Sequence, residues 1–320
     1  TEGLFAVTQE LLGVRYEPVA EAPRWHPDVQ AFDIYNSGGG EPIARFYMDL
    51  YPRANKYGHA AAFTLRRGRR LPDGSYQKPA SAIVANFTKP GAKSPSLLRH
   101  SEVVTFFHEF GHILHQTLTQ AEFLEFAGSA TERDFVEAPS QMLEHWCWTA
   151  ESLSRFARHY ETGEPLPPAL LDSMIRAKNV SSGVAALRQI FFSRLDLAYH
   201  SPGFAGDSTA VLADLHGITG FPYEAGTTFQ AGFGHLMGGY DAGYYGYLWS
   251  RVYGDDMWTR FEAAGPFDPA TGAAYRRAVL ERGGSVDGDE LVRDFLGREP
   301  NTDAFLRELG LELAPDAAGA

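Results

Sequence analysis

The sequence predicts an α+β fold that is mostly helical, with a small sheet near its start. Strand-like segments and turn signals lie ahead of Pro95. Beyond Pro95 the apolar residues recur with the 3.6-residue period of amphipathic helices. No linker or internal repeat divides the chain, so we expect one domain over residues 1–320.

The strands of the sheet are expected in three stretches. Residues 33–51, "DIYNSGGGEPIARFYMDLY", indicate two strands joined by a glycine-rich connection. Residues 57–65 and 80–88 are further strand candidates, with the turn signal "LPDGSYQKP" between them. The GGG run lacks the GxGxxG spacing and no clear helix follows it, so phosphate binding is not expected there.

Helical periodicity dominates the rest of the chain. The predicted helices cover residues 101–119, 136–159, 167–177 and 183–200, and a helical pattern returns over 248–309. Residues 161–168 are expected to form a loop. Residues 226–247 are rich in glycine and tyrosine and predict no regular element, and the tail 314–320 is expected to fray.

Composition excludes several classes of function. The chain has 320 residues, 44% apolar and 21% charged, and a net charge of −12, which disfavours nucleic acids and anionic membranes as partners. No run approaches the ~20 apolar residues that span a bilayer. The basic cluster, which lies beside the turn "LPDG" and indicates a solvated hairpin tip, comprises Arg66, Arg67, Arg69 and Arg70.

The single cysteine, Cys147, excludes an internal disulfide. It stands between Trp146 and Trp148 in a predicted helix, which favours a small buried hydrophobe over a nucleophile. A chain without disulfides fits a reducing compartment, so we expect a cytoplasmic protein. A monomer is expected.

The stretch "TFFHEFGHILHQ", residues 105–116, contains the pattern HExxH. His108 and His112 are four residues apart, about 400° around an α-helix, so their side chains lie on one face, one turn apart. Two imidazoles placed in this way bind one Zn²⁺. Glu109 lies about 100° round the helix, where it reaches a water at the metal without being a good ligand.

The pattern alone arises by chance about as often as by function, but its context favours a buried metal helix. Apolar residues surround the two histidines. Gly111 beside His112 costs ~1 kcal/mol in a helix interior, which suggests that another segment or a ligand comes close. His115 is expected to pack near the site rather than to bind the metal.

A catalytic zinc takes three protein ligands and keeps one open position. The next predicted helix offers four carboxylates, at Glu132, Asp134, Glu137 and Glu144. Glu137 is flanked by Val136 and Ala138, and a carboxylate in such an apolar stretch is costly unless it is paired or bound to a metal. Glu137 is therefore the preferred third ligand. Glu132 and Asp134 are expected near the ligands or exposed, and Glu144 on a solvated face.

Three blocks of the sequence resemble the thimet oligopeptidase family of zinc metallopeptidases, which includes neurolysin, oligopeptidase A and bacterial peptidyl-dipeptidase. The blocks are "RFYMDLYPRANKYGHAA", the segment from "FHEFGHILHQ" to "DFVEAPSQMLEHW", and "FGHLMGGYDAGYYGYLWSRVY". They occur in the family order and cover nearly the whole chain. The resemblance implies a zincin-like, neurolysin-like catalytic domain with a small sheet beside the HExxH helix.

The resemblance also implies the roles of individual residues. His108, His112 and Glu137 match the ligands of one Zn²⁺ per chain, and Glu109 matches the general base, in agreement with the spacing argument. The matching oxyanion donor is Tyr247, helped by His235. Tyr240 and His235 match substrate-contacting residues. Tyr244 is a weaker substrate candidate, and Tyr245 is expected to pack. Residues 80–88 match the strand that pairs with the peptide backbone.

The implied activity is hydrolysis of peptide bonds in short peptides, as an oligopeptidase or a dipeptidyl carboxypeptidase. Family members carry a large helical region ahead of the point where this sequence begins, so residues 1–320 match the catalytic part. A truncated, weak or silent homologue that binds peptides is the alternative. A structural zinc site is disfavoured, because such sites usually have four protein ligands, often cysteines.

Overall fold

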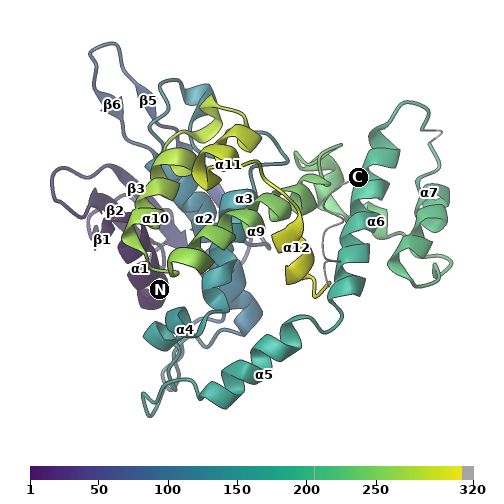
Figure 1. The fold of residues 1–320 in the computed structure, drawn as a ribbon, viewed down its shortest axis with the longest axis horizontal. Helices are drawn as coiled ribbons and strands as arrows, with labels where there is room; N and C mark the ends of the chain where they lie inside the picture. Colours follow the sequence, from purple (N-terminus) through teal and green to yellow (C-terminus); the bar gives the residue numbers. More distant parts are fainter. Residues whose placement is uncertain (205, 312–320) are drawn as a thin grey trace, which may run out of the picture.

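The computed structural model describes residues 1–204 and 206–311 and confirms the predicted α+β class (Figure 1). The tail 314–320, predicted to fray, lies outside the described residues. The main sheet has the strand order β1-β2-β3-β7-β4. Its strands are β1 (Val14–Pro18), β2 (Gln30–Asn36), β3 (Ala44–Asp49), β7 (Ala80–Val84) and β4 (Ala61–Arg66).

Pairing within this sheet is mixed. β2 runs antiparallel to both β1 and β3, β3 and β7 are parallel, and β4 runs antiparallel to β7. β1 and β4 are therefore the two terminal strands, and β7 is paired on both sides. The expectation that residues 80–88 pair with a peptide backbone is wrong for Ala80–Val84, because β3 and β4 occupy both sides of β7.

The arginine-rich segment forms the expected hairpin. Strands β5 (Arg69–Arg70) and β6 (Tyr76–Gln77) pair as a separate two-stranded sheet. The turn between them closes through the Leu71 N–H, which donates to the Ser75 carbonyl at 2.9 Å. Arg69 and Arg70 are exposed, as a solvated hairpin tip requires.

Helices account for most of the remaining chain. The α-helices are α1 (Glu2–Leu12), α2 (His100–Leu118), α3 (Ala138–Leu143), α4 (Ala150–Phe156), α5 (Pro168–Lys178), α6 (Ser182–His200), α7 (Ser208–Leu215), α8 (Phe229–Gly232), α9 (Gly246–Ala264), α10 (Pro269–Tyr275), α11 (Gly288–Leu296) and α12 (Asp303–Glu308). Short 3-10 turns lie at Leu124–Phe126, Glu144–Cys147, His216–Thr219, Gly234–Met237 and Gly283–Ser285, and a π-turn at Arg276–Leu280. In the described residues, no helix has the length and apolar character of a membrane span.

The single helix predicted over 136–159 is wrong, because the chain breaks it twice. α3 tightens into the 3-10 turn Glu144–Cys147. The Thr149 hydroxyl then accepts the Ser152 N–H at 3.3 Å and starts α4 as a new helix. Threonine is a favoured N-cap residue, because its hydroxyl accepts a backbone N–H of the first turn. Thr149 is therefore a helix-start signal that is visible in the sequence.

α2 packs its apolar face against the main sheet. Phe110 is fully buried and meets Phe46 of β3 edge-on, with ring centroids 5.3 Å apart. Phe106, Phe107 and Ile113 extend the same buried face. Each fully buried side chain of this size contributes roughly 1.5–3 kcal/mol through removal from water. This packing fixes which side of α2 is left for polar groups.

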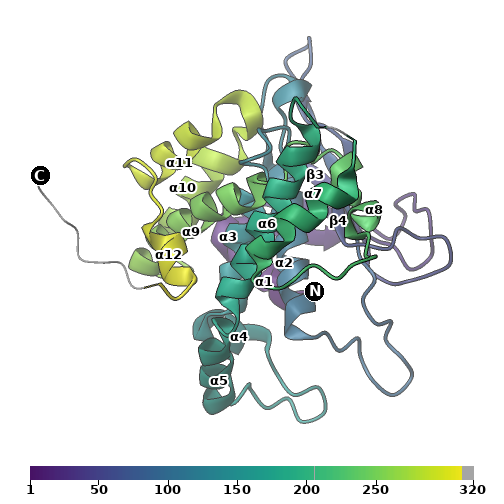
Figure 2. The same ribbon diagram turned by 90° about the vertical axis from the view of Figure 1, so that its right-hand side faces the viewer.

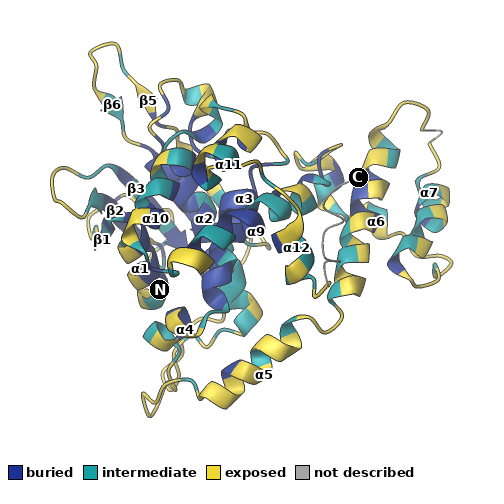
Figure 3. Ribbon diagram, in the orientation of Figure 1, coloured by how far each residue is buried: buried dark blue, intermediate teal, exposed yellow. Residues whose placement is uncertain are grey.

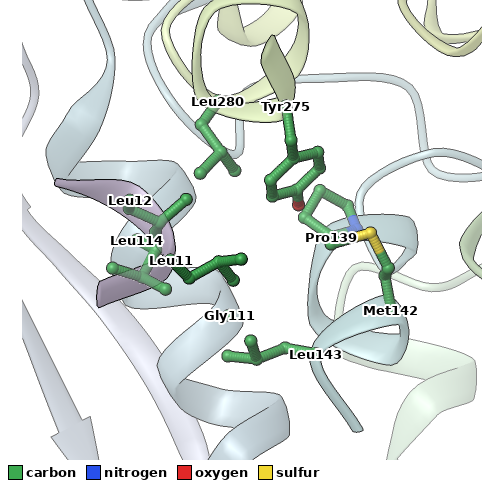
Figure 4. Close-up of a pocket in the computed structure, with 9 residues that line it drawn as sticks. All are labelled: Leu11, Leu12, Gly111, Leu114, Pro139, Met142, Leu143, Tyr275 and Leu280. Atoms are coloured by element: carbon green, nitrogen blue, oxygen red, sulfur yellow. The ribbon is translucent and has the colours of Figure 1, made fainter. Parts of the chain in front are cut away.

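α2 crosses α3 at Gly111, as the glycine suggested. A Cβ atom at this position would lie 2.5 Å from the Cα of Ser140 and 3.1 Å from the carbonyl oxygen of Pro139. Figure 4 shows the apolar pocket beside this crossing, which is lined by leucines with Met142 and Tyr275. At about 10 Å³ it is a packing gap and far smaller than a ligand pocket.

Helices α5, α6 and α7 extend away from the main core (Figures 1 and 2). Figure 3 shows much of α5 and α6 exposed, in contrast to α2 and α3. A separate apolar cluster holds α6 to α7 and to the glycine- and tyrosine-rich stretch; it contains Phe191, Phe192, Leu195, Leu212 and Tyr244.

Gly111→Ala should destabilise the fold by about 1–3 kcal/mol, because the added methyl forces α2 and α3 apart. Gly183→Ala is the matched control: Gly183 lies in α6 with open space around it, where alanine gains up to ~1 kcal/mol of helix propensity. Urea unfolding of both variants measures the difference. Equal stability would contradict the close crossing.

Candidate active site

The polar face of α2 carries the two histidines of the HExxH pattern. His108 and His112 lie one turn apart, with ring centroids separated by 5.0 Å. Their side chains keep 19% and 13% exposure, so both rings stand at the edge of the core. The helix thus presents two imidazoles toward one point, as the four-residue spacing predicts.

Glu137 lies immediately before α3 and reaches that point. Its Oε2 atom is 3.1 Å from the Nε2 atom of His108 and 3.1 Å from that of His112. Glu137 is only 2% exposed. The crossing at Gly111 is what brings the start of α3 within reach of α2.

These three side chains fit a metal ion. Each offers one ligand atom, and the three atoms lie within 4.8 Å of one another. Two imidazole nitrogens and one carboxylate oxygen form a donor set typical of catalytic Zn²⁺. Burial alone would raise the pKa of Glu137, but the neighbouring His112 and His108 rings hold it well below its usual value. The carboxylate therefore remains charged and available to a cation.

Glu144 contacts His108 at the ring nitrogen that faces away from Glu137. The expectation that Glu144 lies on a solvated face is therefore wrong. His108 Nδ1 and Glu144 Oε1 are 2.8 Å apart, and the glutamate side chain is 18% exposed. Arg251 of α9 donates to the other Glu144 oxygen at 3.3 Å and to Asp255 at 2.9 Å. Such a partner fixes the orientation and tautomer of a metal-binding imidazole.

Glu109 faces the strand β4. It is 8% exposed, and burial raises its pKa, opposed by the nearby His112 and His108 rings and by a hydrogen bond from the Ala62 backbone. A carboxylate with a raised pKa is better matched to proton transfer near neutrality than an ordinary one. Because Ala62 belongs to β4, a terminal strand of the sheet lies directly beside this carboxylate.

A cluster of charged side chains holds the chain segment that leads into β4. Arg53 donates to both oxygens of Asp49, at 2.6 and 2.8 Å. Lys56 donates to the carbonyls of Tyr51 and Ala85, which closes the segment over the ends of β3 and β7. These residues give no signal in the sequence, where they look like ordinary charges around a turn.

The glycine- and tyrosine-rich stretch reaches Glu137, which lies beside the histidine pair. The Tyr240 hydroxyl donates to Oε1 of Glu137. Tyr240 and Tyr247 stack with ring centroids 4.9 Å apart, and His235 lies 5.7 Å from each ring. Burial and the negative charge of Glu137 raise the pKa of Tyr247, which keeps its hydroxyl a hydrogen-bond donor.

Tyr244 and Tyr245 point elsewhere. Tyr244 is 6% exposed and its hydroxyl donates to Gln189 of α6 at 3.0 Å. The Tyr245 hydroxyl donates to Asp134 at 2.8 Å. These contacts fasten the stretch to α6 and to the segment ahead of α3.

His115 is fully buried and is not among the three potential metal ligands. Neither of its ring nitrogens has a hydrogen-bond partner in the described structure. Burial lowers its pKa to about 3, so the ring stays neutral. Glu132 is exposed. Arg133 was not singled out by the sequence analysis; its guanidinium lies 5.0 Å from the centre of the Tyr240 ring.

Comparison with known proteins identifies the family. The model of peptidase family M3 matches residues 1–311. The chain belongs to peptidase family M3. The resemblance to thimet oligopeptidases is thereby confirmed.

Curated relatives match this M3 chain over 97% of its length. Thimet-like oligopeptidase of Dictyostelium discoideum is 40% identical over 318 residues, 47% of that protein. Oligopeptidase A of Escherichia coli is 40% identical over 316 residues, 46% of that protein. Saccharolysin of Saccharomyces cerevisiae is 37% identical over 327 residues, 45% of that protein. The chain thus spans about half the length of the relatives it matches.

Solved structures support the fold. The structure called "BsuCP Crystal Structure" aligns with a TM-score of 0.55 at 16% identity, over 83% of this chain and 54% of that chain. The one called "The Structure of CHT" aligns with a TM-score of 0.53 at 13% identity, over 82% of this chain and 53% of that chain.

Glu144→Ala should weaken zinc binding by about 10–100-fold, because His108 loses the partner that orients its ring. Glu125→Ala is the control, since Glu125 is exposed and lies apart from the histidine pair. Competition with a chromogenic chelator measures the Kd of both variants. An unchanged Kd for Glu144→Ala would contradict the supporting role.

Proposed function

We propose that this chain is the catalytic part of a zinc-dependent peptidase acting on short peptides. The observation that carries the proposal is the convergence of His108, His112 and Glu137 with Glu109 beside them. Membership of peptidase family M3 supports the same reaction. One zinc per chain would be held by the two imidazoles and the Glu137 carboxylate.

A bound zinc would polarise the scissile carbonyl and lower the pKa of a water molecule. Glu109 acts as the general base that takes a proton from the attacking water. It then returns that proton to the nitrogen of the leaving amine, so one carboxylate serves both halves of the reaction. Its burial beside β4 keeps bulk water from competing for the proton.

The aromatic groups act on the substrate carbonyl. Tyr247, whose hydroxyl stays protonated, donates a hydrogen bond to the developing oxyanion, with His235 beside it. Tyr240 keeps the substrate-contacting role that the resemblance implies, whereas the weaker candidate Tyr244 is buried and its hydroxyl donates to Gln189, which argues against a substrate role. Tyr240 also holds the Glu137 carboxylate through its hydroxyl.

The edge of β4 offers a backbone on which an extended peptide can pair. β4 is a terminal strand, and Ala62 within it lies beside Glu109. A peptide added to such an edge gains main-chain hydrogen bonds with little dependence on side chains. The peptide-pairing role that was expected of residues 80–88 is therefore proposed for β4, because β4 covers β7.

The alternative is a homologue that binds peptides without cleaving them. The presence of Glu109 and of three potential ligands favours turnover, but only an activity measurement separates the two. Endopeptidase action and dipeptide release are both compatible with the proposed function. The monomeric state and the cytoplasmic location stay predictions.

Glu109→Gln should lower the turnover of a quenched fluorescent peptide of ~ten residues by about 10²–10⁴-fold, because the general base is lost. Zinc content should not change, since Glu109 is not a proposed ligand. Chelation should abolish the wild-type activity and added zinc should restore it.

Glu125→Gln, at an exposed site, serves as the control and should keep wild-type turnover. Full activity of Glu109→Gln would refute the mechanism. Zinc-loaded wild type without any cleavage would favour the silent peptide-binding alternative.

A further inference from the structure

Asp196 of α6 is a fully buried carboxylate outside the cluster of potential metal ligands. Its exposed fraction is 0%, and it lies on the face of α6 that meets the glycine- and tyrosine-rich stretch. α6 is one of the helices α5, α6 and α7 that extend away from the main core in Figure 1 and are here called the extended lobe. Its apolar cluster is separate from the main core. A buried carboxylate is costly unless donors satisfy it.

The backbone donors come from the loop 238–245, which lies ahead of α9. The Ala242 N–H donates to Asp196 Oδ1 at 3.0 Å, and the Tyr244 N–H donates to Oδ2 at 2.9 Å. His200, one turn along α6, places Nδ1 2.9 Å from Oδ1. Both carboxylate oxygens therefore hold backbone amides of one loop, which a neutral amide with a single acceptor oxygen cannot do.

The loop needs such an anchor at Ala242. This residue has a φ of 56°, in the left-handed region that disfavours side chains other than glycine. Backbone in such a conformation persists only where its surroundings over-determine it. The bonds from the N–H groups of Ala242 itself and of Tyr244 to Asp196 supply that constraint, and the Tyr244 hydroxyl adds a second tie to Gln189 of the same helix.

The same loop carries side chains of the proposed active site. Tyr240, two residues before Ala242, donates to Glu137, and its ring stacks on Tyr247 at 4.9 Å. Tyr244, directly held by Asp196, packs on Tyr247 with ring centroids 5.0 Å apart. A continuous set of contacts thus runs from α6 through the loop to the proposed metal ligand.

We propose that Asp196 is a positioning residue: it clamps two loop amides to α6 and so holds Tyr240 and Tyr247 in register with Glu137. It touches neither substrate nor metal, and its effect on catalysis rests on the proposed peptidase function. The extended lobe then contributes to the reaction, because α6 fixes the positions of Tyr240 and Tyr247 through Asp196.

Asp196→Asn tests the proposal in the zinc-loaded protein. Hydrogen–deuterium exchange should show amides in segment 238–247 exchanging at least about tenfold faster. Local opening of the loop then no longer requires breaking two hydrogen bonds to a carboxylate. Peptide kcat should fall by about tenfold or more, with a smaller change in KM. The zinc Kd should stay within about threefold of wild type, since all three proposed ligands remain.

Asp214→Asn is the matched control, because Asp214 lies on α7 of the same lobe and is exposed; it should change none of these quantities. If Asp196→Asn does not fold, Asp196→Ser replaces it, since serine avoids placing an NH₂ donor against the two loop N–H groups.

Unchanged exchange in segment 238–247 overturns the clamp. Faster exchange with unchanged kcat, in an active wild type, overturns the positioning role. A wild-type chain that cleaves no peptide refutes the proposed function instead. In that case the exchange comparison alone decides whether Asp196 holds the loop.

Discussion

The site depends on the close crossing of α2 and α3. Without a side chain at Gly111, the backbone of Ser140 approaches α2 closely enough for Glu137 to reach both histidines. The sheet fixes the other side of α2 through Phe110 and Phe46. Helix α2 is therefore held between two layers, and its polar face has one orientation in which two imidazoles and one carboxylate meet.

Buried charges surround this point, and each is satisfied by a group from another part of the chain. Glu144 and Arg251 hold His108 from behind, Tyr240 holds the second oxygen of Glu137, and Asp196 holds the loop that carries Tyr240. Unpaired, such groups would be costly in a low-dielectric interior. Because these charged groups are paired, they fix the positions of the side chains around the site, which apolar packing alone would not fix.

The sequence predicted the local features well and the long-range ones poorly. The helix over 101–119 and the meaning of Gly111 follow from periodicity and propensity, which act within a few turns. Which strand lies at the sheet edge depends on pairing between distant residues, so β4 was expected as a strand but its position at the edge was not. Glu144 looked solvated because its partners His108 and Arg251 are far away in sequence. Asp196 gave no signal, since one aspartate in a helix is commonplace.

The most direct test of the account is the metal environment of the purified chain. Zinc titration followed by X-ray absorption at the zinc edge should give one ion per chain, with two imidazoles and one carboxylate among its ligands. Glu137→Ala should leave the imidazole signal while removing the carboxylate and weakening the site. A chain that binds no zinc, or whose zinc lacks the imidazole signal, would contradict the central claim that α2 and α3 meet to form a metal site.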